Sequence, residues 1–252
     1  GKVGICGGIN LADEYINAYE KHGHWKDTAV VLRGDAVWNL TRMFLQVWGV
    51  AAKEPCPDVR QYRVENYVQA PGFVQPYSDS PLDEFRVAES VYMQIVNRAN
   101  RYVYITTPYL ILDSEFITAL KMAAQSGVDV RIVTPHVADK WFVHMVTRSN
   151  YLPLLRSGVK IYEYTPGFIH AKMFVSDDNC AVVGTANLDY RSLYLHHECA
   201  VTIVDNPAVN EVRDDILKTI QISQEITIEE LKSQGLLTRI VAALLKNFAP
   251  LM

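Results

Sequence analysis

The sequence lacks the cysteine spacings that identify many small or metal-binding proteins. Its four cysteines are Cys6, Cys56, Cys180 and Cys199, and none of them forms a CxxC pair or a spacing typical of metal ligands. This usage fits a reducing compartment better than a disulfide framework, and it predicts no metal site. We therefore expect the four thiols to behave as small buried hydrophobic groups.

Long apolar runs and excess positive charge are also absent. No stretch reaches about 18 consecutive apolar residues, so the sequence predicts no helix that spans a bilayer. The first ten residues do not combine a basic region with an apolar run, so no signal peptide is predicted. A net charge of -4 supplies no broad basic surface, and this disfavours nucleic acid as a partner because counterion release could not drive tight binding.

The chain does contain an internal repeat. The segment GICGGINL at 4–11 aligns with AVVGTANL at 181–188, and both are typical of a strand that enters a glycine-containing turn. The alignment pairs identical residues: Gly7 with Gly184, Asn10 with Asn187, and Leu11 with Leu188. Further along, an acid precedes a strand in each copy, which pairs Asp27 with Glu198. A helical stretch follows in both, at 35–48 and at 207–222.

The repeat predicts two units, the first of which has lost its beginning. Segments 53–60 and 69–81 are rich in Pro, Gly, Ser and Asp and indicate a connection. We assign residues 1–66 to the C-terminal remnant of the first unit and residues 67–252 to a complete second unit. The second unit alternates between expected helices at 82–97, 114–125, 139–156 and 231–252 and expected strands at 102–107, 128–133 and 159–164. The predicted fold class is α/β, with each unit a mixed β-sheet flanked by helices.

The expected C-terminal helix is amphipathic. Its apolar residues are Leu236, Leu237, Ile240, Val241, Leu244, Leu245 and Phe248. Such a stripe packs on a core, or it lies in a membrane interface with Arg239 and Lys246 toward the headgroups. Core packing is the favoured interpretation.

The segment 168–187 carries the residues most typical of chemistry. It reads FIHAKMFVSDDNCAVVGTAN and contains the pattern H-x-K-x4-D-x6-G-x2-N, formed by His170, Lys172, Asp177, Gly184 and Asn187. Residues two apart share one face of a strand, so we expect His170 and Lys172 to point the same way. Phosphoryl transfer requires a nucleophile or proton donor of this kind beside cations that hold the phosphoryl oxygens. The turn at Gly184 would add Thr185 and Asn187 as hydrogen-bond donors.

This pattern closely resembles the HKD signature of the phospholipase D superfamily. Segments 7–16, 25–30 and 43–48 are similar to the bacterial cardiolipin synthase branch of that superfamily. The resemblance implies a phospholipase D-like fold in which His170 and Lys172 are catalytic. It implies phosphate contacts from Asn187, Thr185, Asn10 and Gly8.

The resemblance also suggests roles for the remaining polar residues. Asp177 belongs to the catalytic motif, although a structural role suits it better. Glu198 sits where the family has the carboxylate that orients a catalytic histidine, and Asp27 is its supporting counterpart in the first copy. Tyr109, in the segment TPY at 107–109, is a candidate for the substrate channel, with a buried core tyrosine as the alternative.

The implied activity is that of a phosphatidyltransferase. It would make cardiolipin from two phosphatidylglycerol molecules through a phosphatidyl-histidine intermediate, with no cofactor. The expected location is the bacterial cell membrane, with the catalytic part on the cytoplasmic side and the membrane spans in sequence before Gly1. The first His, Lys and Asp of the motif would also precede Gly1. We therefore expect the chain to require the missing N-terminal half and to be inactive alone.

Two alternatives remain open. One is a phospholipase D-like hydrolase or nuclease that assembles its site from two copies of a one-motif chain. The partial first motif at 7–10 argues against this, since a one-motif protein has no use for it. The other is a non-catalytic binding remnant, against which the intact His170 and Glu198 argue.

Overall fold

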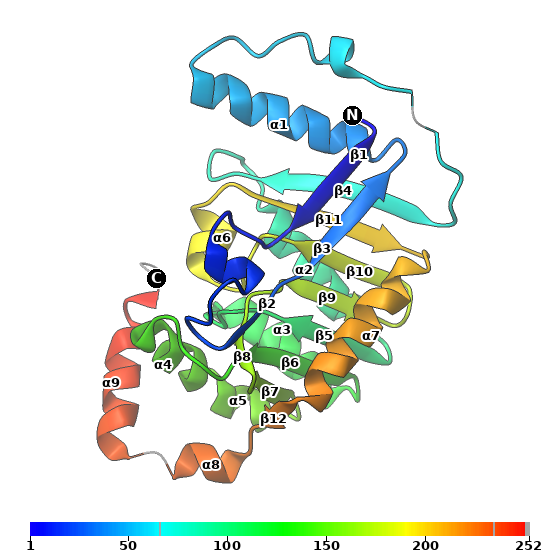
Figure 1. Cartoon of the computed structure of the whole chain (residues 1–252). Helices are drawn as coiled ribbons and strands as arrows, with labels where there is room; N and C mark the ends of the chain where they lie inside the picture. The colour runs from blue at the N-terminus through cyan, green and yellow to red at the C-terminus, as the bar shows by residue number, and fades with distance from the viewer. Residues whose placement is uncertain (66, 234, 250–252) are drawn as a thin grey trace.

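The computed structural model describes residues 1–65, 67–233 and 235–249. Its centre is an eight-stranded mixed sheet in the order β12-β7-β6-β5-β9-β10-β11-β4 (Figure 1). Strands β5, β6 and β7 run parallel to one another, and the other neighbours in the sheet are antiparallel. The strands are β4 (Phe73–Asp79), β5 (Tyr102–Thr106), β6 (Asp129–Pro135), β7 (Lys160–Tyr164), β9 (Met173–Ser176), β10 (Cys180–Gly184), β11 (Glu198–Val204) and β12 (Ser223–Glu225).

Helices cover both faces of this sheet and create two hydrophobic cores. One core lies under α2 (Val87–Arg98), α3 (Ser114–Gln125) and α5 (Tyr151–Leu155), and the other lies under α7 (Ala208–Gln221). Side-chain alternation along each strand supplies both cores. In β5, for example, Val103 and Ile105 face the first core and Tyr102 and Tyr104 face the second. The predicted α/β class with helices flanking a mixed sheet is confirmed.

The first unit contributes a second copy of the β10–β11 hairpin. Strands β1 (Val3–Gly7) and β3 (Ala29–Arg33) pair antiparallel and lead into α1 (Val37–Ala52), just as β10 and β11 lead into α7. The register is the same in both copies, with Gly7 opposite Ala29 and Gly184 opposite Ala200. The next residue also bonds equivalently, since the Gly8 N–H donates to the Thr28 carbonyl at 3.2 Å and the Thr185 N–H to the Cys199 carbonyl at 2.9 Å. The predicted repeat is therefore present in three dimensions.

A short parallel pair of strands joins the two units. Strand β2 (His24–Lys26) pairs with β8 (Gly167–Ile169), with Lys26 opposite Ile169. The N–H of His170 then donates to the Lys26 carbonyl at 2.7 Å. Because both strands end at the same level, the residues that follow them, Asp27 and His170, lie side by side.

Two expected long helices are each divided. The helix expected at 139–156 consists of α4 (Trp141–Ser149) and α5, and the helix expected at 231–252 consists of α8 (Ile228–Lys232) and α9 (Leu236–Lys246). Pro153 explains the first break, because it has no N–H to donate to the carbonyl of Ser149. Residues 234 and 250–252 of the second expectation lie outside the described ranges.

The segment expected to be a connection contains a strand. Residues 73–79 form β4, an edge strand paired with β11, and this position tolerates Pro76 because one side of the strand makes no ladder bonds. The helix expected to begin at Leu82 begins instead at Val87. Before it, the Leu82 N–H donates to the Ser80 hydroxyl at 3.1 Å in a turn, and the Asp79 carboxylate accepts from the Ala88 N–H at 2.7 Å. Both expectations at this position were wrong.

Helix α9 packs along α4, but only part of the C-terminal stripe is buried as the favoured interpretation expected: Ile240, Leu244 and Phe248 are 49%, 60% and 57% exposed. Leu245 and Ala249 join Val143 and Val146 of α4 in a small apolar cluster. The Lys246 ammonium donates to the Asn150 side chain at 2.8 Å. The side chains of Leu236, Leu237 and Arg239 lie outside the description. Among the described residues, no helix combines the length and the apolar character needed to cross a bilayer.

Candidate active site

An open groove of about 1730 Å³ contains most of the residues singled out in the sequence. Both copies of the repeat line it. The predicted site residues along its wall are Gly8, Asn10, Tyr109, His170, Lys172, Thr185, Asn187 and Glu198. The repeat thus brings residues from the two units to one surface, as its two glycine turns predicted.

His170 is held by a carboxylate of the other unit. Its Nδ1 lies 2.8 Å from Asp27 Oδ2, and the second oxygen of Asp27 accepts from the Thr28 N–H at 2.9 Å. The Asp27 side chain is only 3% exposed and that of His170 12% exposed. Burial lowers the pKa of His170 below its ordinary value of 6.5, although the hydrogen bond to Asp27 opposes this shift. The ring is therefore neutral near pH 7, with one nitrogen free to act as a base or nucleophile.

The contact with Lys172 identifies which nitrogen of the His170 ring carries the lone pair. Its ammonium lies 2.8 Å from His170 Nε2 and also donates to the His170 carbonyl at 2.5 Å. An ammonium can only donate, so Nε2 is the acceptor and Nδ1–H donates to Asp27. Burial lowers the pKa of Lys172 from 10.5 to about 7, with Asp27 opposing the shift. The Nε2 lone pair of His170 and the amino group of Lys172, which can gain or lose its proton near pH 7, therefore lie side by side in the groove.

These two residues are adjacent for a different reason from the one expected. The expectation put His170 and Lys172 within one strand. In the structure they lie in the break between β8 and β9, and their side chains meet directly.

An aromatic surround of His170 was not predicted. The ring centroids of Tyr15 and Trp25 both lie 5.3 Å from that of His170, and Phe168 lies 6.2 Å away. Trp25 is buried, and the burial of His170 among these rings explains its lowered pKa. Phe168 could have been found from the sequence, because it precedes His170 by two residues as Lys172 follows it by two. Nothing local in the sequence points to Tyr15.

Glu198 does not contact His170. Its carboxylate accepts from the Thr185 hydroxyl and lies 3.8 Å from His196 Nδ1. Burial raises the pKa of Glu198 above its ordinary value of 4.5. The expectation that Glu198 orients a catalytic histidine is not met by any histidine hydrogen bond in the described part of the chain. Its counterpart Asp27 orients His170 instead.

The asparagines differ in the two copies. Asn187 Nδ2 donates to Asp189 at 3.0 Å, and its Oδ1 is buried with no hydrogen-bond partner among the described residues. Asp189 in turn accepts from the Ser192 N–H at 2.8 Å. Asn10 is exposed and donates to the Tyr15 hydroxyl at 3.0 Å. Both asparagines reach the groove, so each can present its amide to a bound anion after a small rotation.

Gly8 packs directly against the Asp27 and Lys172 side chains. A Cβ at this position would lie 2.5 Å from Asp27 Oδ1 and 3.1 Å from Lys172 Nζ. The absence of a side chain therefore allows these charged groups to approach His170. Tyr109 lies further along the groove, where its hydroxyl donates to Asp139 at 2.5 Å. Burial raises its pKa, and the position agrees with a place in the channel wall.

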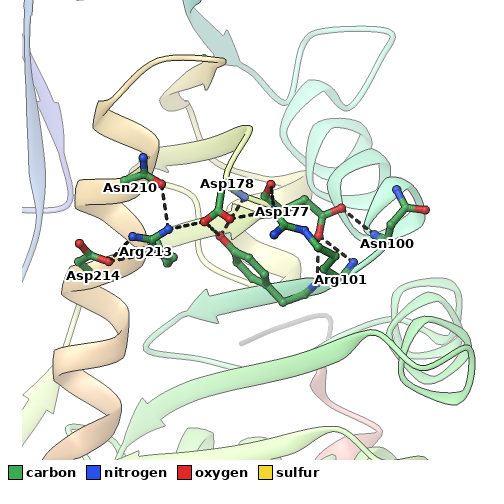
Figure 2. A network of polar contacts seen from close by, with 8 residues as sticks. Asn100, Arg101, Asp177, Asp178, Asn210, Arg213 and Asp214 are labelled. Atoms are coloured by element: carbon green, nitrogen blue, oxygen red, sulfur yellow. Dashed lines mark hydrogen bonds and ion pairs between the residues drawn. The ribbon is translucent and has the colours of Figure 1, made fainter.

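Asp177 lies apart from these residues and has a different environment. It occupies the turn between β9 and β10, and its carboxylate accepts from the N–H groups of Asn100, Arg101 and Tyr102 at 2.7–2.9 Å. The neighbouring Asp178 pairs with Arg213 of α7 (Figure 2). These bonds tie the hairpin to the start of β5. The geometry supports a structural role for Asp177, and this residue is not part of the groove wall.

The described residues contain no group of three or more His, Cys, Asp and Glu side chains arranged to hold a metal ion. The chemistry available in the groove is that of His170 Nε2, the Lys172 ammonium and the hydroxyl and amide donors around them. A neutral imidazole, fixed by a carboxylate and placed beside a cation, suits attack on a phosphodiester.

The fold and this groove define a phospholipase D-type protein. The family model for the cardiolipin synthase, phospholipase D-like domain matches residues 92–220. The chain belongs to this family. Among curated proteins, it is 48% identical over 253 residues to an uncharacterised protein of Streptococcus mutans and 34% identical over 259 residues to a cardiolipin synthase of Geobacillus thermodenitrificans. Both alignments cover 100% of the chain, and they cover 54% and 50% of the relatives, so the chain spans about half their length.

Solved structures agree on the fold. A phosphatidylserine synthase of Haemophilus influenzae superposes with a TM-score of 0.69 at 17% identity, covering 99% of this chain and 67% of the other. The phospholipase D family member Nuc from Salmonella typhimurium superposes with a TM-score of 0.51 at 17% identity, covering 61% of this chain and 97% of Nuc.

Proposed function

We propose that this chain is the catalytic C-terminal half of a phosphatidyltransferase that makes cardiolipin from two molecules of phosphatidylglycerol. The observation that carries the proposal is the Asp27–His170–Lys172 arrangement, in which a carboxylate of one unit holds the histidine of the other. Several curated relatives that match the whole chain at 32–34% identity are cardiolipin synthases, which supports this substrate class over other phosphodiesters.

In the proposed first step, a histidine attacks the phosphorus of phosphatidylglycerol. If His170 is the nucleophile, its Nε2 lone pair forms the new N–P bond, and Asp27 stabilises the positive charge that develops on the ring. Lys172 moves from Nε2 to the phosphoryl oxygens, together with the amide of Asn187 and the hydroxyl of Thr185. The glycerol leaving group takes a proton from a second histidine.

That second histidine is the counterpart of His170 in the first unit. The repeat pairs Asp27 with Glu198, and Asp27 holds His170 across the units. By the same symmetry, Glu198 would hold the first unit's histidine, which this chain does not contain. Its buried carboxylate beside Thr185 already faces the groove. In the second step, that histidine removes a proton from the hydroxyl of another phosphatidylglycerol, whose oxygen displaces His170 from phosphorus to give cardiolipin.

The proposed setting is the surface of the bacterial membrane, on its cytoplasmic side. Phosphatidylglycerol lies within the bilayer, and the groove is open enough to admit a headgroup. In this proposal the membrane anchor is a transmembrane segment outside this chain. The half-coverage of the relatives is compatible with such a segment.

The test identifies the lipid product that is formed by a polypeptide in which the first unit is complete. Incubation with phosphatidylglycerol vesicles should yield cardiolipin and glycerol, and His170→Ala should reduce the rate by about 10⁴-fold. His136→Gln is a matched control, since His136 lies outside the groove wall and is 46% exposed. Release of phosphatidic acid instead of cardiolipin, or cleavage of DNA without lipid turnover, would contradict the proposed acceptor and substrate.

A further inference from the structure

The interface between the two units contains a pair of thiols. Cys6 lies in β1 of the first unit and Cys199 in β11 of the second, 193 positions apart in sequence. Their sulfur atoms are 3.6 Å apart, and Cys6 also points toward the Cys199 carbonyl at 3.8 Å. The other two thiols are elsewhere: Cys180 is half-buried at the start of β10, and Cys56 is exposed, contrary to the expectation that all four are buried.

Within the repeat these positions have no thiol counterparts. The alignment that pairs Gly7 with Gly184 puts Val183 at the position of Cys6, and the alignment that pairs Asp27 with Glu198 puts Thr28 at the position of Cys199. The thiol contact therefore occurs on one side of the pseudo-symmetric interface only. It is not a by-product of the repeat.

The pair is placed for covalent bonding. A disulfide requires the sulfur atoms to approach to about 2.05 Å, which is about 1.6 Å closer than they stand. Cys199 lines the groove, so a small solute reaches it from solvent, whereas Cys6 is only 3% exposed. The Cys199 thiol is therefore accessible from the groove, and the Cys6 thiol is buried next to it.

The two thiols also differ in acidity. The hydrogen bond with Cys6 lowers the pKa of Cys199, whereas this contact and burial raise the pKa of Cys6. The thiolate is the reactive form, so Cys199 is the thiol that reacts first.

We propose that Cys6 and Cys199 form a reversible disulfide that joins the two units when a peroxide enters the groove. The Cys199 thiolate attacks one peroxide oxygen and breaks the O–O bond, which gives a sulfenic acid and, after protonation, water. The Cys6 thiol then attacks the sulfenic sulfur, and a second water leaves as the S–S bond forms. One hydrogen peroxide is reduced for each pair of thiols oxidised, and a dithiol reductant reverses the change by exchange.

The disulfide would act on residues that line the groove. The Cys199 backbone makes hydrogen bonds of 2.9 Å to the Thr185 N–H and hydroxyl, and Cys199 directly follows Glu198. A bond between Cys6 and Cys199 would fix this part of β11 against β1. Oxidation therefore acts on the part of the groove wall that contains Thr185 and Glu198, without consuming any residue of the His170 cluster.

The test uses the purified chain and its Cys56→Ser/Cys180→Ser variant, which retains only the interface pair. After treatment of the folded protein with hydrogen peroxide and alkylation of free thiols, mass spectrometry of a non-reduced digest should show Cys6 joined to Cys199 within a monomer. The melting temperature should rise by about 5 °C or more, and dithiothreitol should reverse both effects. The unsubstituted chain gives the same crosslink, so the result does not depend on the serine variants folding.

A Cys56→Ser/Cys199→Ser variant is the matched control, because it pairs Cys6 with the more distant Cys180. It should form no intramolecular crosslink. Recovery of Cys6 as a free alkylated thiol while Cys199 is oxidised to sulfinic acid would overturn the proposal. Equal crosslinking of Cys6 to Cys180 would overturn it as well. Neither outcome depends on lipid turnover, so this test is separate from that of the proposed function.

Discussion

At the scale of single residues, the site is held together by buried charge. Asp27, His170 and Lys172 form a chain of contacts of 2.8 Å, and two of the three side chains are 3% exposed. Keeping an ammonium in this position costs stability, because burial favours its neutral form. The groove therefore gains a cation beside the reacting nitrogen at the expense of folding free energy.

This cost leads to a prediction about pH. The unfolded chain keeps the Lys172 proton up to about pH 10.5, whereas the folded chain loses it near a pKa of about 7. Between these values the unfolded state binds more protons, so this residue makes the free energy of unfolding rise with pH, by at most about 1.4 kcal/mol per unit. Lys172→Met should remove this slope and raise stability at pH 7 by about 1–3 kcal/mol, while abolishing activity.

Urea unfolding between about pH 7 and pH 9 measures the slope. Lys160→Met is a suitable control, because that ammonium is 46% exposed and pairs with Asp129 at the surface. An unchanged slope in Lys172→Met would mean that the folded protein keeps this lysine fully charged across the range.

The sequence predicted His170 and Lys172 as neighbours from their spacing alone. It could not assign Asp27 to His170, because that contact depends on the parallel pairing of β2 with β8 across 143 positions. Local patterns carry no information on such pairing. The resemblance pointed to Glu198 as the carboxylate of a catalytic histidine without saying which one, and in the structure Glu198 accepts from the Thr185 hydroxyl.

At the scale of the elements, each hairpin of the repeat depends on a glycine. A Cβ on Gly7 would lie 2.3 Å from the Thr28 carbonyl oxygen. A Cβ on Gly184 would lie 2.3 Å from the Cβ of Ala200. Both contacts involve the strand opposite, so the hairpins close only without a side chain.

We expect Gly7→Ala and Gly184→Ala each to lower the free energy of unfolding by about 2–4 kcal/mol, since backbone must move to relieve the overlap. Gly235→Ala is the matched control and should change stability by less than about 0.5 kcal/mol, because no described atom beyond its two chain neighbours lies within 4 Å of its Cβ position. Chemical denaturation of the three variants measures the effect. A neutral Gly184→Ala would show that the hairpin tolerates a wider spacing than the structure has.

Helices α1 and α7 occupy equivalent places in the repeat but differ in what they cover. On α7, Ile216 and Thr219 are buried against the sheet. The aligned residues of α1, Phe44 and Val47, are 61% and 55% exposed, and α1 lies at the upper edge of the molecule in Figure 1. The start of α1 is covered in the same way, since Val37 is buried, but the positions that α7 buries further along are exposed on α1.

We therefore predict that a sheet of the complete first unit covers α1. Phe44→Ser should lower the stability of a polypeptide with that unit complete by about 3 kcal/mol, and that of this chain by less than about 0.5 kcal/mol. Met122→Ser, at a 62% exposed position of α3, should have little effect in either. Thermal unfolding of both polypeptides gives the comparison, and equal small effects of Phe44→Ser in both would rule out burial of this stripe.

Element boundaries were the part of the fold least accessible from the sequence. The helix at 114–125 matches α3 at both ends, because Asp113 caps its first turn and Gly127 follows its last. Strand β4 was missed because Pro76 is typical of loops, and only pairing with β11 at the edge of the sheet makes it a strand.

At the scale of the whole molecule, the groove is a shared structure. Gly8 and Asn10 reach it from the first unit, and His170, Lys172 and Asn187 reach it from the second. The site has one histidine held by a carboxylate, and it has a second buried carboxylate, Glu198, without such a histidine among the described residues. The proposed reaction therefore needs a second histidine at Glu198, supplied by another polypeptide segment.

The most direct test compares cardiolipin formation by this chain with that by a polypeptide whose first unit is complete, while the mass of each in solution is measured. Groups that act as a unit fail together, so the chain alone should turn over phosphatidylglycerol at least about 10⁴-fold more slowly. The completed polypeptide should be active as a monomer. Comparable turnover by a dimer of this chain alone would contradict the account, because two copies of His170 would then suffice and the carboxylate at Glu198 would need no histidine from a first unit.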